Sequence, residues 1–261
     1  MAKDDILEVR TRDKICFLTL NRPDVRNAFN AEMNAMMAEA ILAADYDPDV
    51  FMVAITGAGD KAFCSGADLN EAREADDAGK VFRGPLHSGR RGLFEIMLDS
   101  KKPIMAIVNG PAIAGGCELA LAADLRVVAE NAFFALPEAK RARGAHFASV
   151  VLPQMVPPGI AMEWLYTGRR IPIDEAERWG LVNRRAPLEN LMDTAMELAN
   201  HILSSAPLSL QRMKLTYRKT VGLPLLAGMR LDVGPDVYAS EDQVEGARAY
   251  LEKRDPVWKG R

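Results

Sequence analysis

The first half of the chain alternates short apolar runs with helical or glycine-containing segments, and this alternation limits the folds that it can adopt. The runs are rich in β-branched and other apolar residues and end at polar or glycine turns, which is typical of buried strands. They are residues 6–10, 15–20, 51–56, 103–108 and 124–129. Between them, Asn30 is a suitable N-cap for a helix over 30–44, where Met and Ile recur at helical spacing. Strands that alternate with helices predict an α/β layer.

The second half of the chain has mostly helical patterns. Asp174 and Glu177 match a capping box, and Gly180 stands where that helix would stop. Further helices are predicted over residues 188–203, 207–220, 224–238 and 243–253. The apolar side chains of 224–238 could pack on their own domain or on another subunit, and the pattern leaves both open.

Composition and charge exclude several classes of protein. The formal net charge is −3, so the chain has no cationic excess to neutralise a nucleic-acid backbone. Cys16, Cys64 and Cys117 form no CxxC motif, which favours reduced thiols in a cytoplasmic protein. Charged, glycine or proline residues break every apolar stretch before it reaches membrane-spanning length, and no secretory signal is recognisable at the N-terminus.

Two glycine-containing stretches each follow a predicted buried strand. Residues 62–69 read A-F-C-S-G-A-D-L, and residues 108–118 read V-N-G-P-A-I-A-G-G-C-E. Small residues at such junctions let a ligand approach the backbone, and two free amides aimed at one point would form an oxyanion hole. Neither stretch is a dinucleotide fingerprint or a P-loop, and either one alone could be packing glycine only.

Residues 71–91 differ from their neighbours in being charged and in lacking periodicity. They are interpreted as a surface loop or as a flap over a site, and the sequence does not separate these alternatives.

Both glycine stretches resemble motifs of the enoyl-CoA hydratase (crotonase) superfamily. Residues 63–69 differ from the family's approximate F-C-A-G-A-D-L only at Ser65, and residues 109–120 resemble N-G-x-A-x-G-G-G-C-E-L-A, with Ala114 in place of the first of three glycines. Residues 134–138 then read F-A-L-P-E and place Glu138 20 residues after Glu118, as in the family's hydratases. Further similar segments are residues 20–23, 26–30, 167–170, 179–183 and 240–242, so the resemblance covers nearly the full length.

The resemblance implies a fold and an assembly. It predicts an α/β spiral of repeated ββα units over residues 1–200, which would hold the active site. A C-terminal α-helical region over residues 201–261 would join subunits into a homotrimer or a dimer of trimers.

The resemblance also implies an activity, the hydration of a 2-enoyl-CoA thioester. Backbone amides of Ala67 and Gly115 would bind the thioester oxygen, Glu118 would activate water, and Glu138 would deliver a proton to the α-carbon. The two acids would share their protons, so this division of roles is provisional. An isolated Glu is usually a solvated surface residue, but the apolar neighbours of both acids favour partial burial and a raised pKa.

Coenzyme A is expected as part of the acyl-CoA substrate, and neither a separate cofactor nor a metal is expected. By position in the family, Arg26 and Ala28 would contact its adenine and phosphates. Lys253 would reach a phosphate, in its own or a neighbouring subunit. For Arg26 and Lys253 an ordinary surface cation is an equally good interpretation. The residues beside the oxyanion donor are expected to contact the pantetheine arm or its pocket. They are Asp68, Leu69 and Asn70.

Residues 139–149 depart from the family, since A-K-R-A-R-G-A-H-F-A-S replaces a run of small residues containing P-x-x-G-G. Larger side chains therefore stand where glycines line the acyl end of the pocket. We hypothesise that His146, with Arg143, alters acyl specificity; the alternative is that these side chains only face solvent or pack. Residues 252–261 resemble the crotonobetainyl-CoA hydratase branch, whose cationic substrate would not suit an Arg- and His-rich pocket, so that substrate is not adopted.

Three other functions compete with hydration. An enoyl-CoA isomerase or another crotonase-type lyase or hydrolase would share the fold, but one carboxylate is enough for isomerisation, so the pair favours hydration. A non-catalytic acyl-CoA-binding or scaffold protein is supported only by the altered residues 139–149. RNA binding, known for some relatives, is disfavoured by the acidic balance.

Overall fold

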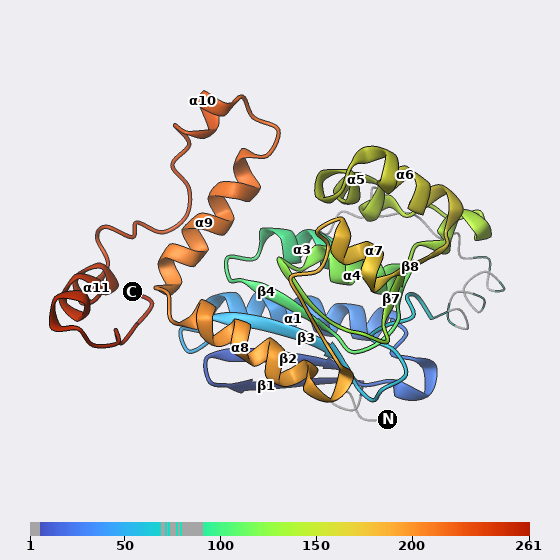
Figure 1. The fold of residues 1–261 in the computed structure, drawn as a ribbon, viewed down its shortest axis with the longest axis horizontal. Helices are drawn as coiled ribbons and strands as arrows, with labels where there is room; N and C mark the ends of the chain where they lie inside the picture. Colours follow the sequence, from blue (N-terminus) through green and yellow to red (C-terminus); the bar gives the residue numbers. More distant parts are fainter. Residues whose placement is uncertain (1–5, 69–70, 72, 74–76, 78, 80–90) are drawn as a thin grey trace.

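A central sheet of six strands forms the body of the protein (Figure 1). The structure, a computed structural model, describes residues 6–68, 71, 73, 77, 79 and 91–261. In spatial order the strands are β1 (Leu7–Arg12), β2 (Ile15–Leu20), β3 (Met52–Gly57), β4 (Ile104–Val108), β6 (Leu125–Ala129) and β9 (Arg184–Ala186). The β1–β2 pair is antiparallel and every other pair in this sheet is parallel. A second sheet joins β5 (Ala112–Ile113), β7 (Phe133–Ala135) and β8 (Arg170–Pro172).

The inner strands form where the apolar runs predict them. Strand β4 is buried along its whole length, and β2 and β3 are buried at all but one position each. Continuous rather than alternating burial is expected for parallel strands covered on both faces. The prediction of an α/β layer is confirmed.

Helices cover the sheet and form the second half of the chain. They are α1 (Ala31–Tyr46), α3 (Leu93–Asp99), α4 (Gly115–Ala122), α5 (His146–Met155), α6 (Pro158–Thr167), α7 (Ile173–Arg178), α8 (Leu191–Leu203), α9 (Pro207–Thr220), α10 (Leu225–Gly228) and α11 (Glu241–Glu252). Helix α1 begins as predicted, because the Asn30 side chain accepts a hydrogen bond from the Met33 amide at 2.8 Å. Within the described residues, no helix is both long and apolar enough to cross a membrane.

Two helix predictions are wrong in detail. Helix α7 begins at Ile173 after Pro172 and has no side-chain cap, so Asp174 and Glu177 form no capping box. The helix predicted over 224–238 is only the four-residue α10, after which the chain is irregular as far as Ser240. Gly180, with φ +82°, does end α7 as predicted.

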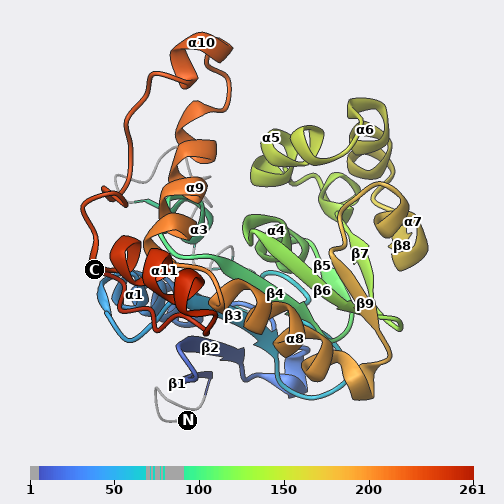
Figure 2. The same cartoon turned by 60° about the vertical axis from the view of Figure 1, so that its left-hand side comes forward.

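The C-terminal helices stand away from the sheet. In Figures 1 and 2 α9 rises beside α3, with α10 at its far end. Asp124, which precedes β6, ties α9 to the body, since its carboxylate lies 2.7 Å from Lys214 Nζ and 3.2 Å from Arg218 Nη2. The predicted boundary at 200/201 falls inside α8, which packs on β4, β6 and β9.

Residues 71–91 lie almost wholly outside the described part of the chain, so the choice between a surface loop and a flap stays a prediction.

Candidate active site

The two glycine-containing stretches lie against each other. Cys64 and Ala112 form a parallel bridge, in which the Ile113 amide donates to the Cys64 carbonyl at 2.9 Å. A Cβ placed on Gly66 would lie 3.2 Å from the Gly115 nitrogen. Positions 66–67 and 114–115 therefore meet at the start of α4.

The amides of Ala67 and Gly115 are available to a ligand. Gly115 is the first residue of α4, where backbone amides have no acceptor within the helix. Over the residues described, neither amide donates a hydrogen bond to another protein group. Two such amides on adjoining segments fit an oxyanion hole, and their convergence on one oxygen stays a prediction.

Backbone strain occurs at this junction. Ala114, the N-cap of α4, has φ 53° and ψ −126°, a conformation that glycine adopts far more readily than alanine. Gly66 and Gly116, one from each stretch, have no room for a side chain. A Cβ on Gly116 would lie 2.2 Å from the Cys64 carbonyl oxygen, and one on Gly66 would lie 2.9 Å from the Ala114 methyl. The close approach of the two stretches therefore requires glycine at 66 and 116.

Glu118 lies in the first turn of α4 and is half-buried. The Ala148 amide donates to its Oε1 at 3.0 Å. The pKa of Glu118 is raised to about 7, chiefly by burial and also by the charge of Glu138, while hydrogen bonds from the Ala148 and Phe147 amides partly oppose the rise. A carboxyl with this pKa exchanges protons readily near neutral pH.

Glu138 lies in the 3-10 helix Pro137–Arg141, directly after the second sheet. Pairing of β5 with β7 brings this turn to the start of α4, because Ile113 lies opposite Ala135. Glu138 is half-buried, and burial raises its pKa, although the charge of Arg141 lowers it in part. Its Oε2 is buried and has no hydrogen-bond partner among the described residues. The structure thus brings the two predicted acids together in an environment that favours their protonated forms.

A cationic cavity of about 360 Å³ adjoins the glycine stretches. Arg26 lines it, together with Lys61 and Arg170, which the sequence analysis did not select as site residues. The Arg170 guanidinium lies 4.6 Å from the centre of the Phe133 ring, which also lines the cavity. Three cations around one cavity suit a phosphate-bearing ligand.

Arg22 connects the segment that follows β2 to the first glycine-containing stretch. Its guanidinium donates to the Ala28 carbonyl and to the Asp68 carboxylate, both at 2.8 Å. Ala28 is buried, so it can offer a ligand little more than its backbone. Asp68 is half-buried and ion-paired with Arg22, a partner that sequence reasoning missed. Leu69 and Asn70 lie outside the described residues.

Two of the predicted substrate contacts, those of His146 and Lys253, stay predictions. His146 is the first residue of α5 and is exposed, as is Arg143. Lys253 ends α11, which both views place away from α4 (Figures 1 and 2). A contact from Lys253 of a neighbouring subunit stays a prediction.

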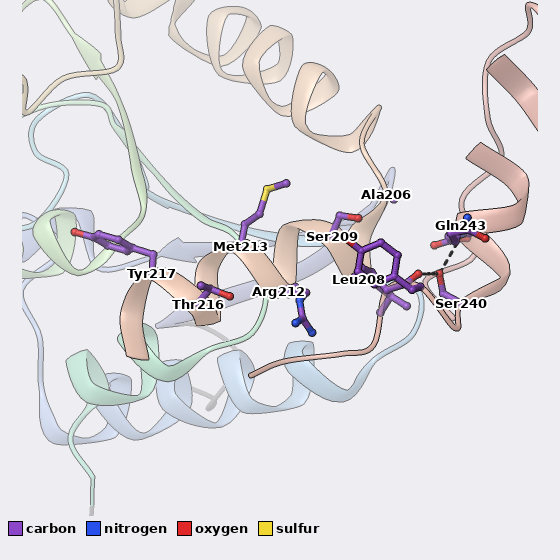
Figure 3. Close-up of a pocket in the computed structure, with 12 residues that line it drawn as sticks. Ala206, Leu208, Ser209, Arg212, Met213, Thr216, Tyr217, Ser240 and Gln243 are labelled. Carbon is purple, nitrogen blue, oxygen red and sulfur yellow. Dashed lines mark hydrogen bonds between the residues drawn. The ribbon is translucent and has the colours of Figure 1, made fainter. Parts of the chain in front are cut away.

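A larger cavity, of about 650 Å³, lies elsewhere, between α9 and the segment that leads into α11. In Figure 3 Arg212, Met213 and Tyr217 project from α9, while Ser240 and Gln243 come from the start of α11. Neither Glu118 nor Glu138 lines this cavity, so it is not the candidate catalytic site, although it is the larger of the two cavities. No cluster of metal-ligating side chains occurs among the residues that the structure describes.

Comparisons with known proteins agree with this geometry. The profile of the enoyl-CoA hydratase/isomerase family matches residues 10–261. The carnitinyl-CoA dehydratase of Salmonella paratyphi C (strain RKS4594) is 45% identical over 262 residues, 98% of each chain. That of Citrobacter koseri is 46% identical over 251 residues, 94% of each chain.

Solved structures match equally broadly. The crystal structure of an enoyl-CoA hydratase from Mycobacterium tuberculosis H37Rv superposes with a TM-score of 0.87 at 35% identity, over 98% of this chain and 100% of that one. An enoyl-CoA hydratase from Bacillus anthracis superposes with the same TM-score at 30% identity, over 98% of this chain and 100% of that one. The similarity therefore spans nearly the whole of each compared chain.

Proposed function

The chain belongs to the enoyl-CoA hydratase/isomerase family and is a hydro-lyase, and we propose that it adds water in syn fashion across the 2,3 double bond of a 2-enoyl-CoA thioester. One observation carries the proposal: two half-buried carboxyls with raised pKa lie together at the start of α4. A single proton-shuttling acid would be enough for isomerisation, whereas hydration uses a base for water and an acid for carbon.

In the proposed reaction Glu118 and Glu138 divide the proton transfers. Ionised Glu118 removes a proton from water while the water oxygen bonds to the β-carbon. The electron pair of the double bond moves onto the thioester oxygen, where the amides of Ala67 and Gly115 stabilise the enolate, typically by about 3–4 kcal/mol per donor. Glu138 then protonates the α-carbon, and proton transfer from Glu118 to Glu138 restores the starting state.

The substrate's CoA part is assigned to the cationic cavity. Arg26, Lys61 and Arg170 would pair with its phosphates, and the carbonyl of Ala28 is a hydrogen-bond acceptor for its adenine. Asp68 acts through Arg22 to hold this segment. Contacts from Leu69, Asn70 and Lys253 remain proposals by family position.

A second candidate substrate comes from the comparisons. The relatives named carnitinyl-CoA dehydratase are 45% identical over nearly the whole chain, and hydration is the reverse of dehydration. The charge argument against a cationic acyl group assumed that Arg143 and His146 line the acyl pocket. Both are exposed and line neither of the two cavities described above, so we include the carnitinyl type among the substrates to be tested.

The C-terminal helices are proposed to join subunits. Leu225, Leu226 and Met229 are exposed on and beside α10, and apolar as well as polar side chains of α9 line the larger cavity of Figure 3. A surface of this kind favours association with another subunit, and the resemblance to the family suggests a homotrimer or a dimer of trimers. Light scattering on the purified protein tests this assembly. A cytoplasmic location stays a prediction from the sequence.

The activity is tested with purified protein and a panel of 2-enoyl-CoA thioesters, including crotonyl-CoA and crotonobetainyl-CoA. Loss of the absorbance of the conjugated thioester reports hydration, and chromatography distinguishes a hydroxyacyl product from an isomer. Glu118→Gln and Glu138→Gln should each lower kcat by about 100-fold or more. Wild-type turnover no faster than that of either variant would refute the proposal.

A further inference from the structure

Two aromatic rings meet next to α4. Phe94 on α3 and Phe147 on α5 have ring centroids 4.9 Å apart, with their planes inclined by 45°. Helices α3 and α5 both pack against α4, the helix that carries Glu118 (Figure 2). Both rings pack on the hydrophobic core and yet are only half-buried, so part of the pair's apolar surface remains uncovered.

The backbone of Phe147 belongs to the surroundings of Glu118. The amide of the next residue, Ala148, donates to Glu118 Oε1 at 3.0 Å, and the Phe147 amide helps to hold the same carboxylate. The Phe147 ring is attached one residue from the amide that binds this oxygen, so it projects from the same turn of α5 that holds Glu118. Phe94, on α3, contacts this ring.

Phe147 also falls in the segment that departs from the family. In residues 139–149 a run with glycines is expected at the acyl end of the pocket, and here the run contains a phenylalanine. A small side chain there would leave space beyond the reacting carbons, whereas a ring paired with a second ring fills it. Aromatic pairs at this separation stabilise each other beyond their burial, so the wall resists displacement.

We propose that the Phe94–Phe147 pair closes the acyl end of the site and restricts the enzyme to short 2-enoyl-CoA thioesters. The proposal rests on the hydratase function proposed above. A short acyl group such as crotonyl ends before the pair. A longer chain must displace the rings or turn toward solvent, and either loses apolar contact for each added methylene.

The test compares one chain-length ratio across variants. The kcat/KM of trans-2-decenoyl-CoA divided by that of crotonyl-CoA is measured for the wild type, Phe94→Ala, Phe94→Leu and Phe147→Leu. We expect the wild type to prefer crotonyl-CoA at least tenfold, and Phe94→Ala to raise the ratio at least tenfold. Because both substrates are measured on one preparation, the fraction of folded protein cancels.

Two controls make the outcome specific. Tyr166→Ala removes an exposed aromatic ring on α6 and should leave the ratio at the wild-type value. Phe94→Leu keeps most of the side-chain volume, so it stays folded if the alanine variant does not, and it should raise the ratio by a smaller factor.

The possible results distinguish a failure of this inference from a failure of the proposed hydratase function. A wild type that hydrates both thioesters equally well, or a ratio unchanged in both Phe94 variants, overturns the role of the pair and leaves the hydratase function standing. A wild type that hydrates no thioester of any length removes the proposed function, and the inference with it.

Discussion

Replacing Glu118 by glutamine should make the protein more stable at alkaline pH while removing its activity. The reason is the raised pKa of Glu118, about 7 in the folded protein against an ordinary value of 4.5. The folded state therefore binds this proton more tightly than the unfolded state does. The wild type loses stability as the pH rises from about 4.5 to about 7, where the carboxyl ionises in a half-buried place. Glutamine cannot ionise and escapes this loss.

The magnitude follows from the two pKa values. They differ by about 2.5, which at about 1.36 kcal/mol per pKa unit corresponds to about 3.4 kcal/mol. Because Glu118 is half-buried, solvent screens part of this energy, and we expect Glu118→Gln to gain about 2 kcal/mol at pH 8. The amide oxygen of glutamine can still accept from the Ala148 amide, so that hydrogen bond is retained in weaker form. At pH 4.5 and below the gain should disappear.

Urea unfolding followed by circular dichroism at pH 4.5, 6 and 8 measures this difference. The matched control is Glu39→Gln, which makes the same substitution at an exposed position in the middle of α1 and should change stability by less than about 0.5 kcal/mol at each pH. A Glu118→Gln variant no more stable than the wild type at pH 8 would refute the reasoning. A gain of equal size at all three pH values would refute it as well.

Three further predictions concern the same site. The kcat/KM for hydration should rise with pH through about 7, because only ionised Glu118 accepts a proton from water, and a pH–rate profile without this limb would contradict the assignment. In urea unfolding Gly116→Ala should lower the free energy of unfolding by about 3 kcal/mol or more, since the new methyl would lie 2.2 Å from the Cys64 carbonyl oxygen. Its control, Gly144→Ala, should change the free energy of unfolding little, because a methyl there would meet nothing within 4 Å. In the same assay Ala114→Gly should stabilise by about 1 kcal/mol, because glycine relieves the strain at φ 53° and its greater freedom in the unfolded chain offsets only part of that gain.

The sequence predicts the fold best where local pattern and burial agree. Residues 15–20 form β2 and residues 207–220 form α9 with the predicted bounds. The helix predicted over 224–238 fails because a helical pattern needs a surface to pack on, and Leu225, Leu226 and Met229 are exposed in the single chain. The short strands β8 and β9 escape prediction because three-residue runs with arginine carry no periodic signal; long-range pairing creates them.

The site divides in the same way. The glycine stretches and the two acids carry local signatures, so sequence reasoning finds them and the pairing of β5 with β7 brings them together. Arg170 reaches the cavity of Arg26 only because β8 pairs with β7, placing Arg170 opposite Ala135. The meeting of Phe94 and Phe147 likewise depends on how α3 and α5 pack. No local pattern reports these contacts, so the sequence could indicate the acids but not the cavity walls around them.

Three destabilising features of this structure argue that the site is retained for catalysis. Glu118 is held where ionisation is unfavourable, Glu138 has a buried oxygen without a partner among the described residues, and Ala114 occupies a conformation suited to glycine. Each feature lowers the stability of the folded state, and glutamine at 118 and glycine at 114 would relieve two of them. All three lie around the first turn of α4. A protein that retained this fold only to bind or to assemble would gain stability by losing them, whereas a hydratase needs a base that titrates near neutral pH, an acid that holds its proton, and a backbone turned toward the thioester oxygen.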